Sequence, residues 1–390
     1  MKISRTFLRV AAVSCIVVAS PMSWAAEFLV GVEVPLTGKL ARAGSGMYEG
    51  VQVAAAVFNA KHPQHRIELI KVDNESQPAK AVAGVEWLAS KDVLAITGGY
   101  GSNLIAPASE TAEKAGLVYV TSGGVDPSLT EKGLKNFFRI NNIDGYSKAV
   151  IGLLDTMDVK SASILYSTKD ATTDLAKEVE HALKAAGRKV HLHAFDPHIT
   201  DFKPVMNKVR LLDKPDVVVM SGYENDYVGI IRAAKVLKPD VDALVGVWSL
   251  ATPKMAEDFP DLMPNVYGTA SMPDPPVYTS AEGQEFAAEY EALFDKNPDY
   301  VAQFGYVQSQ LLFDAILRAH ETGRLDEPGA IAEEMRQIDQ STLIGRVAFN
   351  AQGDNPHFTH RMGQHQSGNV VLVWPDSAAT GEMKYPGVPW

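Results

Sequence analysis

Residues 93–121, VLAITGGYGSNLIAPASETAEKAGLVYVT, hold the pattern that decides the fold of this 390-residue chain. Residues 93–97 and 117–121 are short runs rich in Val, Ile and Leu, which is typical of strands buried on both faces. Residues 104–115 lie between them and form a helical stretch of more than ten residues. A strand, a helix and a second strand in this order predict a parallel βαβ unit.

The same alternation runs through the first two thirds of the chain in two sets. In the first set we expect strands at 28–34 and 66–72 and helices at 46–60 and 79–90. In the second set we expect helices at 147–157, 173–186, 202–212 and 226–237, with strands at 161–166, 189–195, 216–220 and 243–247. Two such sets predict the α/β class with two doubly wound lobes.

The last third does not begin a third set. It reads as helices at 281–295, 301–322 and 328–337, with short strands at 345–350 and 370–374, after a Pro-rich connector at 273–276. We therefore expect several hinge crossings, with lobe 1 formed by 26–144 and 275–345 and lobe 2 by 145–274 and 346–390. A ligand is expected in the cleft between the lobes, where strands end.

The N-terminal residues 1–25 have the composition of a secretory signal peptide. Lys2, Arg5 and Arg9 precede an apolar run at 10–19, and small residues lead to a cleavage position near Ala25 and Ala26. About ten apolar residues are too few for a membrane span, which needs about 20. We expect a periplasmic protein cleaved at this position. A lipoprotein signal ending at the single cysteine, Cys15, is the alternative.

The charge and the motifs exclude several function classes. Cleavage would move the formal charge from −11 to −14, which disfavours binding to nucleic acid or to an anionic membrane. The chain has no Gly-x-Ser-x-Gly motif, so an exported enzyme is disfavoured and no cofactor is expected. Two histidine groups do not predict a metal site, and we interpret them as solvated strand faces: His191, His193 and His198, and His357, His360 and His365.

Several short motifs resemble those of the periplasmic leucine/isoleucine/valine-binding protein family, in the same order and spacing. They include residues 35–38 (PLTG), 72–74 (VDN), 126–130 (DPSLT), 215–218 (PDVV) and 353–354 (GD). The resemblance implies type I periplasmic binding protein architecture, a monomer that closes on a small solute and delivers it to an inner-membrane ABC permease. A sensor of the same fold that feeds a membrane receptor is the alternative.

The resemblance also implies how a carboxylate is held. Ser102 matches the family's serine after the third strand, next to Gly101. Gly123 and Gly124 match the segment whose backbone amides bind the carboxylate, but Val125 stands where a threonine hydroxyl usually assists.

The match is weaker for the ammonium group of an amino acid. Trp248 stands at or beside the place of the family's carboxylate, and Glu224 or Asp170 would have to replace it. An unpaired buried ammonium is costly. We therefore expect a carboxylate with an apolar or aromatic body, bound with help from Arg42 and covered by three aromatic side chains: Tyr100, Tyr223 and Trp248. An amino acid remains the alternative ligand. Each of three residues has an alternative role: Trp248 could pack in the core, Tyr223 could pack at the hinge, and Arg42 could be a solvated cation in a loop.

Overall fold

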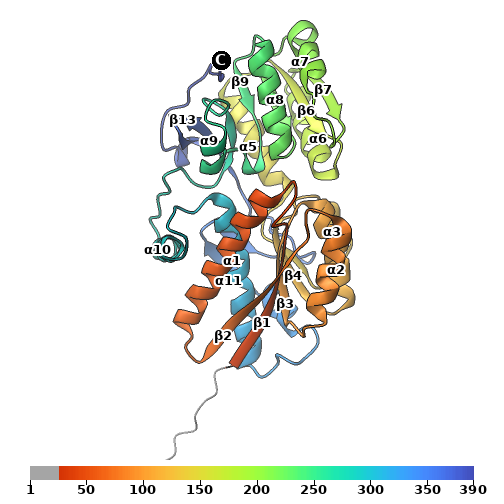
Figure 1. Ribbon diagram of the computed structural model, residues 1–390, viewed down its shortest axis with the longest axis vertical. Coiled ribbons are helices and arrows are strands. Elements are labelled where there is room, and N and C mark those ends of the chain that lie inside the picture. Colours follow the sequence, from red (N-terminus) through yellow and green to blue (C-terminus); the bar gives the residue numbers. More distant parts are fainter. Residues whose placement is uncertain (1–25) are drawn as a thin grey trace, which may run out of the picture.

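The computed structural model describes residues 26–390, which form two lobes, one above the other (Figure 1). The first lobe is built on a parallel sheet of order β2-β1-β3-β4-β5. Its strands are β1 Ala26–Val34, β2 His65–Asp73, β3 Ala95–Tyr100, β4 Val118–Gly123 and β5 Phe137–Arg139. The strands β3 and β4 are buried almost throughout because helices cover both faces of the sheet.

Helices α1 (Ala41–Lys61) and α11 (Tyr300–Glu321) cover one face of this sheet, and α2 (Pro78–Ala89) and α3 (Ser102–Lys114) cover the other (Figure 1). Glycines let α1 and α11 approach closely. A Cβ atom on Gly50 would lie 1.9 Å from the Ala302 carbonyl oxygen, and one on Gly305 would lie 2.2 Å from that of Met47. Shorter helices complete the lobe: α4 Ser128–Glu131, α10 Ala281–Phe294 and α12 Ala330–Arg336.

The second lobe contains a mixed sheet of order β14-β13-β10-β9-β8-β6-β7. Five strands are parallel: β6 Ser161–Ser167, β7 Lys189–Phe195, β8 Val217–Ser221, β9 Ala243–Val245 and β10 Tyr267–Ala270. Strands β13 (Arg361–Gln366) and β14 (Asn369–Trp374) add an antiparallel edge. The helices are α5 Ile143–Thr156, α6 Asp170–Ala185, α7 Lys203–Lys208, α8 Glu224–Leu237 and α9 Pro253–Asp258. A 3₁₀ turn at Trp248–Leu250 follows β9, and another lies at Asp376–Ala378.

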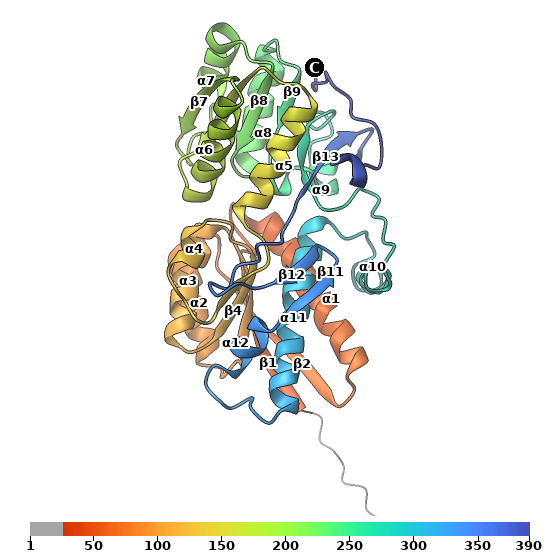
Figure 2. The same ribbon diagram turned by 180° about the vertical axis from the view of Figure 1, so that it is seen from behind.

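The chain passes between the two sheets three times, and two of the crossings run side by side. The first follows β5 and the last precedes β13 (Figure 2). Arg139 is 2% exposed and forms a two-pronged ion pair with Asp354, with Nε–Oδ1 and Nη2–Oδ2 distances of 2.9 and 2.8 Å. Asn355 Nδ2 donates to the Ile140 carbonyl at 2.9 Å. These bonds join the two crossings into one hinge element.

The predicted fold class is confirmed, and the expected alternation of strands and helices is present in both lobes. The sequence did not reveal β5, β10, β13 or β11 (Asp339–Thr342), whereas the strand expected at 345–350 is present as β12 (Gly345–Ala348). Strand β13 reads RMGQHQ, so it lacks the apolar run that marks a strand. The expected helix at 202–212 ends at Lys208 and continues as a π-helical turn, Val209–Asp213. The lobe limits remain a prediction.

The interpretation of the histidines as solvated was wrong for four of them. On β7, His193 Nε2 lies 2.5 Å and His191 Nδ1 3.5 Å from the carboxylate of Asp213, and both side chains are partly buried. His360 and His365 are 4% and 1% exposed because β13 lies inside the second lobe. Within residues 26–390, no group of three or more His, Cys, Asp or Glu side chains is arranged to hold a metal ion.

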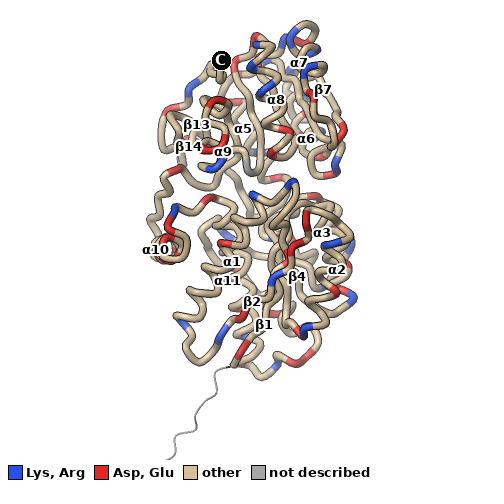
Figure 3. Tube along the Cα trace, in the orientation of Figure 1, with Lys and Arg blue, Asp and Glu red and all other residues tan. Residues whose placement is uncertain are grey.

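Charged residues of both signs are interspersed over the two lobes (Figure 3). Among the described residues, no helix is both long and apolar enough to cross a membrane. The predicted signal peptide and Cys15 lie outside the described residues.

Candidate functional site

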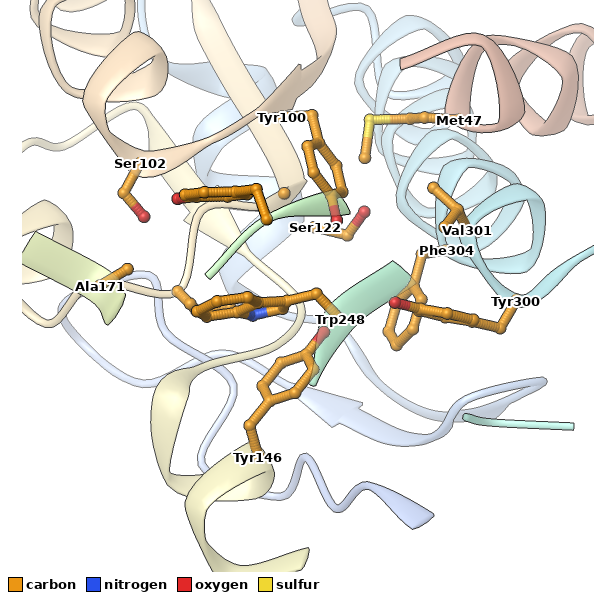
Figure 4. Close-up of a pocket in the computed structure, with 13 residues that line it drawn as sticks. Met47, Tyr100, Ser102, Ser122, Tyr146, Ala171, Trp248, Tyr300, Val301 and Phe304 are labelled. Atoms are coloured by element: carbon orange, nitrogen blue, oxygen red, sulfur yellow. The ribbon is translucent and has the colours of Figure 1, made fainter. Parts of the chain in front are cut away.

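A cavity lies between the two lobes, at the ends of strands β3, β4 and β9 (Figure 4). Both lobes contribute to its wall, so the site is complete only when they face each other. The lining residues are Met47, Tyr100, Ser102, Ser122, Gly123, Val125, Tyr146, Ala171, Tyr223, Trp248, Tyr300, Val301 and Phe304.

Ser102 is placed by the turn between β3 and α3. Gly101 has φ = 100°, a left-handed conformation that favours glycine, and α3 begins at the next residue. Ser102 Oγ accepts a hydrogen bond of 3.2 Å from the backbone N–H of Asp126. This bond uses a lone pair of the hydroxyl and leaves its proton for a ligand in the cavity.

Four helices begin at the cavity wall. Ser102 and Tyr300 are the first residues of α3 and α11, Ala171 is the second residue of α6, and Tyr223 is the N-cap of α8. A helix N-terminus has unpaired N–H groups and the positive end of the helix dipole. Helix α3 has neither a side-chain cap nor an acidic residue in its first turn, so its free N–H groups favour an anionic ligand, whereas α6, α8 and α11 carry carboxylates at this end.

Aromatic rings form much of the wall. Tyr223 stacks on Trp248 with a centroid distance of 5.4 Å and an interplanar angle of 14°. Tyr146 packs against Trp248 at 6.3 Å, and Tyr300 packs against Phe304 at 5.9 Å. Flat faces of this kind suit a planar or branched apolar group. Trp248 has φ = 52°, a conformation that is costly for a side chain of this size.

Hydroxyl groups supply most of the polar character of the side chains in the wall. Burial raises the pKa of Tyr146, Tyr223 and Tyr300, so all three phenols remain protonated at neutral pH. In the described part of the chain, Ser122 Oγ and Tyr300 Oη are buried without a hydrogen-bond partner. These groups are therefore free to bind a ligand.

Of residues 26–390, none that lines the cavity carries a charged side chain. Arg42 and Glu224, both expected at the site, lie outside its lining and pair with each other across the lobes, with Nε–Oε2 at 2.7 Å. Arg42 Nη1 also pairs with Asp258 on α9. Asp170, the other expected substitute for the family's carboxylate, is exposed.

The other predicted residues are at the cavity or next to it. Tyr100, Ser102, Gly123, Val125, Tyr223 and Trp248 line it. Gly101 and Gly124 are the neighbours of lining residues and are not part of the wall. The structure adds lining residues that the sequence did not single out for the site: Met47, Ser122, Tyr146, Tyr300, Val301 and Phe304. Three of these, Tyr300, Val301 and Phe304, lie on α11. The sequence did not predict them because α11 reaches the cavity only after the second crossing between the lobes.

A cation lies beside the wall without lining it. Lys169 Nζ is 4.4 Å from the ring centroid of Tyr223. Burial lowers the pKa of Lys169 and the nearby Lys39 lowers it further, whereas Asp226 raises it. This positive charge is separated from the cavity by a tyrosine ring, and it adds to the preference for an anion.

Comparisons with known proteins agree with this arrangement. Residues 28–368 match the family model described as "Periplasmic binding protein". The chain is 26% identical over 386 residues to "Leu/Ile/Val-binding protein homolog 8" of Brucella abortus, covering 92% of this chain and 93% of that protein. It is 28% identical over 213 residues to an "Amino acid binding protein" of Pseudomonas aeruginosa, covering 53% and 57%.

Solved structures show the same fold. The substrate binding protein of a branched-chain amino acid transporter from Streptococcus pneumoniae, in complex with isoleucine, has a TM-score of 0.77 at 22% identity and covers 90% of this chain and 100% of its own. A solute binding protein of an ABC transporter from R. palustris, in complex with benzoate, has a TM-score of 0.79 at 18% identity, with 91% and 98% covered. Both are two-lobed binding proteins of the architecture described above. From the match of the family model over most of its length, this chain belongs to the periplasmic binding protein family.

Proposed function

We propose that this protein is the periplasmic solute-binding component of an ABC importer and closes on small carboxylates with a flat or branched apolar body. The single observation that supports this most strongly is the cavity wall, whose described lining residues combine aromatic rings and the uncapped N-terminus of α3 with no charged side chain.

The wall discriminates between ligands by the sign of their charge. A carboxylate would accept hydrogen bonds from Ser102 and from the first N–H groups of α3, and the helix dipoles would stabilise it. An ammonium would meet the positive end of α3 and would find no carboxylate among the described lining residues. Burying an ammonium without a partner costs roughly several kcal/mol.

The structural neighbours support both halves of this proposal. The same fold binds isoleucine in one neighbour and benzoate in another, so the fold accommodates ligands with and without an ammonium group. A solute binding protein from R. palustris in complex with 4-hydroxybenzoate has a TM-score of 0.79 at 17% identity. In this chain, the lack of a charged side chain among the described lining residues supports a carboxylate without an ammonium.

A thermal-shift panel of four ligands tests the proposal. Benzoate carries the carboxylate, benzamide replaces it with a neutral group, benzylamine reverses the charge, and leucine carries both charges. We expect benzoate to raise the melting temperature most. A ligand at a hundredfold excess over its Kd stabilises by about 2.7 kcal/mol, which such an assay detects.

The Ser102→Ala variant is the matched test of the site. It should weaken benzoate binding by about 1.5–3 kcal/mol, because a charge-assisted hydrogen bond is lost. Stabilisation by benzylamine or leucine in preference to benzoate, in the unmodified protein, would refute the proposed ligand class.

A further inference from the structure

Two buried hydroxyls in the cavity wall have no hydrogen-bond partner among residues 26–390. Ser122 and Tyr300 are each 5% exposed, and Ser122 Oγ and Tyr300 Oη are both unpaired. Buried polar groups in folded proteins are almost always paired, and an unpaired one is destabilising. Both side chains line the cavity, so a bound molecule can supply the missing partners.

These hydroxyls are separate from the expected carboxylate position. Figure 4 shows Ser102 and Tyr300 on opposite sides of Trp248, with Ser122 beside Tyr100 above the indole. Ser102 stands at the start of α3, Ser122 near the end of β4 and Tyr300 at the start of α11. A flat ligand that is held by its carboxylate at Ser102 and extends across the cavity therefore directs its other end toward Tyr300.

We propose that the cavity is specific for aromatic carboxylates with a second polar group, a ring hydroxyl or carbonyl oxygen, which Tyr300 and Ser122 hydrogen-bond at the end remote from Ser102. The proposal rests on the function proposed above and narrows its ligand class. A ring hydroxyl is the best match, because it donates and accepts at once and each side-chain hydroxyl does the same.

The surroundings of Tyr300 support a role in binding over a role in packing. The residue is the first of α11 and follows the N-cap Asp299, whose carboxylate accepts a hydrogen bond of 2.8 Å from the Ala302 N–H. Its side chain meets Phe304 and His360 edge-on, at 5.9 and 5.8 Å between centroids. These contacts fix the ring and leave the hydroxyl toward the cavity (Figure 4). The Tyr300 hydroxyl can therefore hydrogen-bond a polar substituent of the ligand without a change in the position of its ring.

The experiment compares matched ligands by isothermal titration calorimetry. Benzoate, 4-methylbenzoate, 3-hydroxybenzoate and 4-hydroxybenzoate are titrated into the unmodified protein and into Tyr300→Phe and Ser122→Ala. Tyr306→Phe is the matched control, since Tyr306 lies on α11 but outside the cavity lining. We expect at least one hydroxybenzoate to bind about ten-fold more tightly than the methyl compound, which has a similar size but no hydrogen bond to offer.

Tyr300→Phe should abolish most of this preference, and Ser122→Ala should reduce the preference in the same direction. The control should keep it. Equal affinities for the methyl and hydroxyl ligands in the unmodified protein, or a preference that survives both variants, would overturn the proposal while benzoate binding still upheld the carboxylate site. Failure of all four acids to bind would overturn the proposed function together with it.

Discussion

Replacing Arg42 by glutamine should open the cleft more readily. Arg42 lies on α1 in the first lobe, and its guanidinium bonds Glu224 on α8 and Asp258 on α9 in the second lobe. Both pairs exist only while the lobes are closed on each other. The variant removes them without touching the cavity wall, to which Arg42 does not belong.

The magnitude follows from the exposure of the three side chains. Arg42, Glu224 and Asp258 are 26%, 17% and 31% exposed, so solvent screens the pairs in part. An exposed ion pair contributes about 0.2–1 kcal/mol, and two pairs on one guanidinium should together contribute about 1 kcal/mol to the closed state. This corresponds to an increase of about five-fold in the Kd for a ligand that requires closure.

Stopped-flow measurement of benzoate release at low and high salt tests this expectation. Release from Arg42→Gln should be about five-fold faster in about 0.02 M salt, and the difference should shrink in about 0.5 M salt as screening increases. Lys254→Gln is the control, because Lys254 pairs with Asp258 and Glu257 within the second lobe. Equal release rates in Arg42→Gln and the unmodified protein at low salt, or an equal effect of the control, would refute the role of the two Arg42 ion pairs in holding the lobes closed.

Three further predictions concern the hinge, the first lobe and the cavity wall. Arg139→Ala leaves Asp354 without its partner in the hinge and should cost about 3–5 kcal/mol in urea unfolding, whereas Arg346→Ala, whose ion pair is exposed, should cost less than about 1 kcal/mol. Burial raises the pKa of Glu33 from 4.5 to about 7, so the folded state holds this proton longer than the unfolded state does and stability falls as the pH rises through that window. Glu33→Gln should remove this fall in stability. The effect of the substitution on the free energy of unfolding should therefore be about 3 kcal/mol more favourable at pH 8 than at pH 4 in the same assay. An unchanged pH dependence would contradict the assignment. Trp248→Gly and Trp248→Ala should both lose benzoate affinity, but glycine should melt higher because φ is 52° there; a lower melting point for glycine would contradict the strain.

The α/β class was predictable because parallel strands covered on both faces leave a simple trace in the sequence. Residues 93–97 and 117–121 are apolar except for the final residues Thr97 and Thr121, and the buried strands β3 and β4 overlap them. Strand β13 was not predictable because its buried side chains are polar. Its His365 and Gln364 hydrogen-bond backbone carbonyls inside the lobe, so polar residues replace the apolar run that marks a strand.

The candidate site was predictable where it follows a strand and not where it depends on the crossings. Ser102 and Gly123 lie at the ends of strands of the first lobe, so strand order alone brings them together. Tyr300 reaches the cavity through α11, which returns from the second lobe, and a linear pattern does not show this. Arg42 and Glu224 were predicted to bind the ligand and do lie between the lobes. They form an ion pair with each other and do not line the cavity.

The central claim is that this cavity selects a carboxylate and rejects an α-ammonium, and one pair of calorimetric titrations tests it most directly. Leucine and 4-methylpentanoate differ only in the ammonium group, so the ratio of their dissociation constants isolates its effect. We expect 4-methylpentanoate to bind more tightly than leucine. Tighter binding of leucine, lost on Asp126→Asn, would contradict the claim and would identify Asp126, a buried carboxylate next to the cavity residue Val125, as the partner of the ammonium.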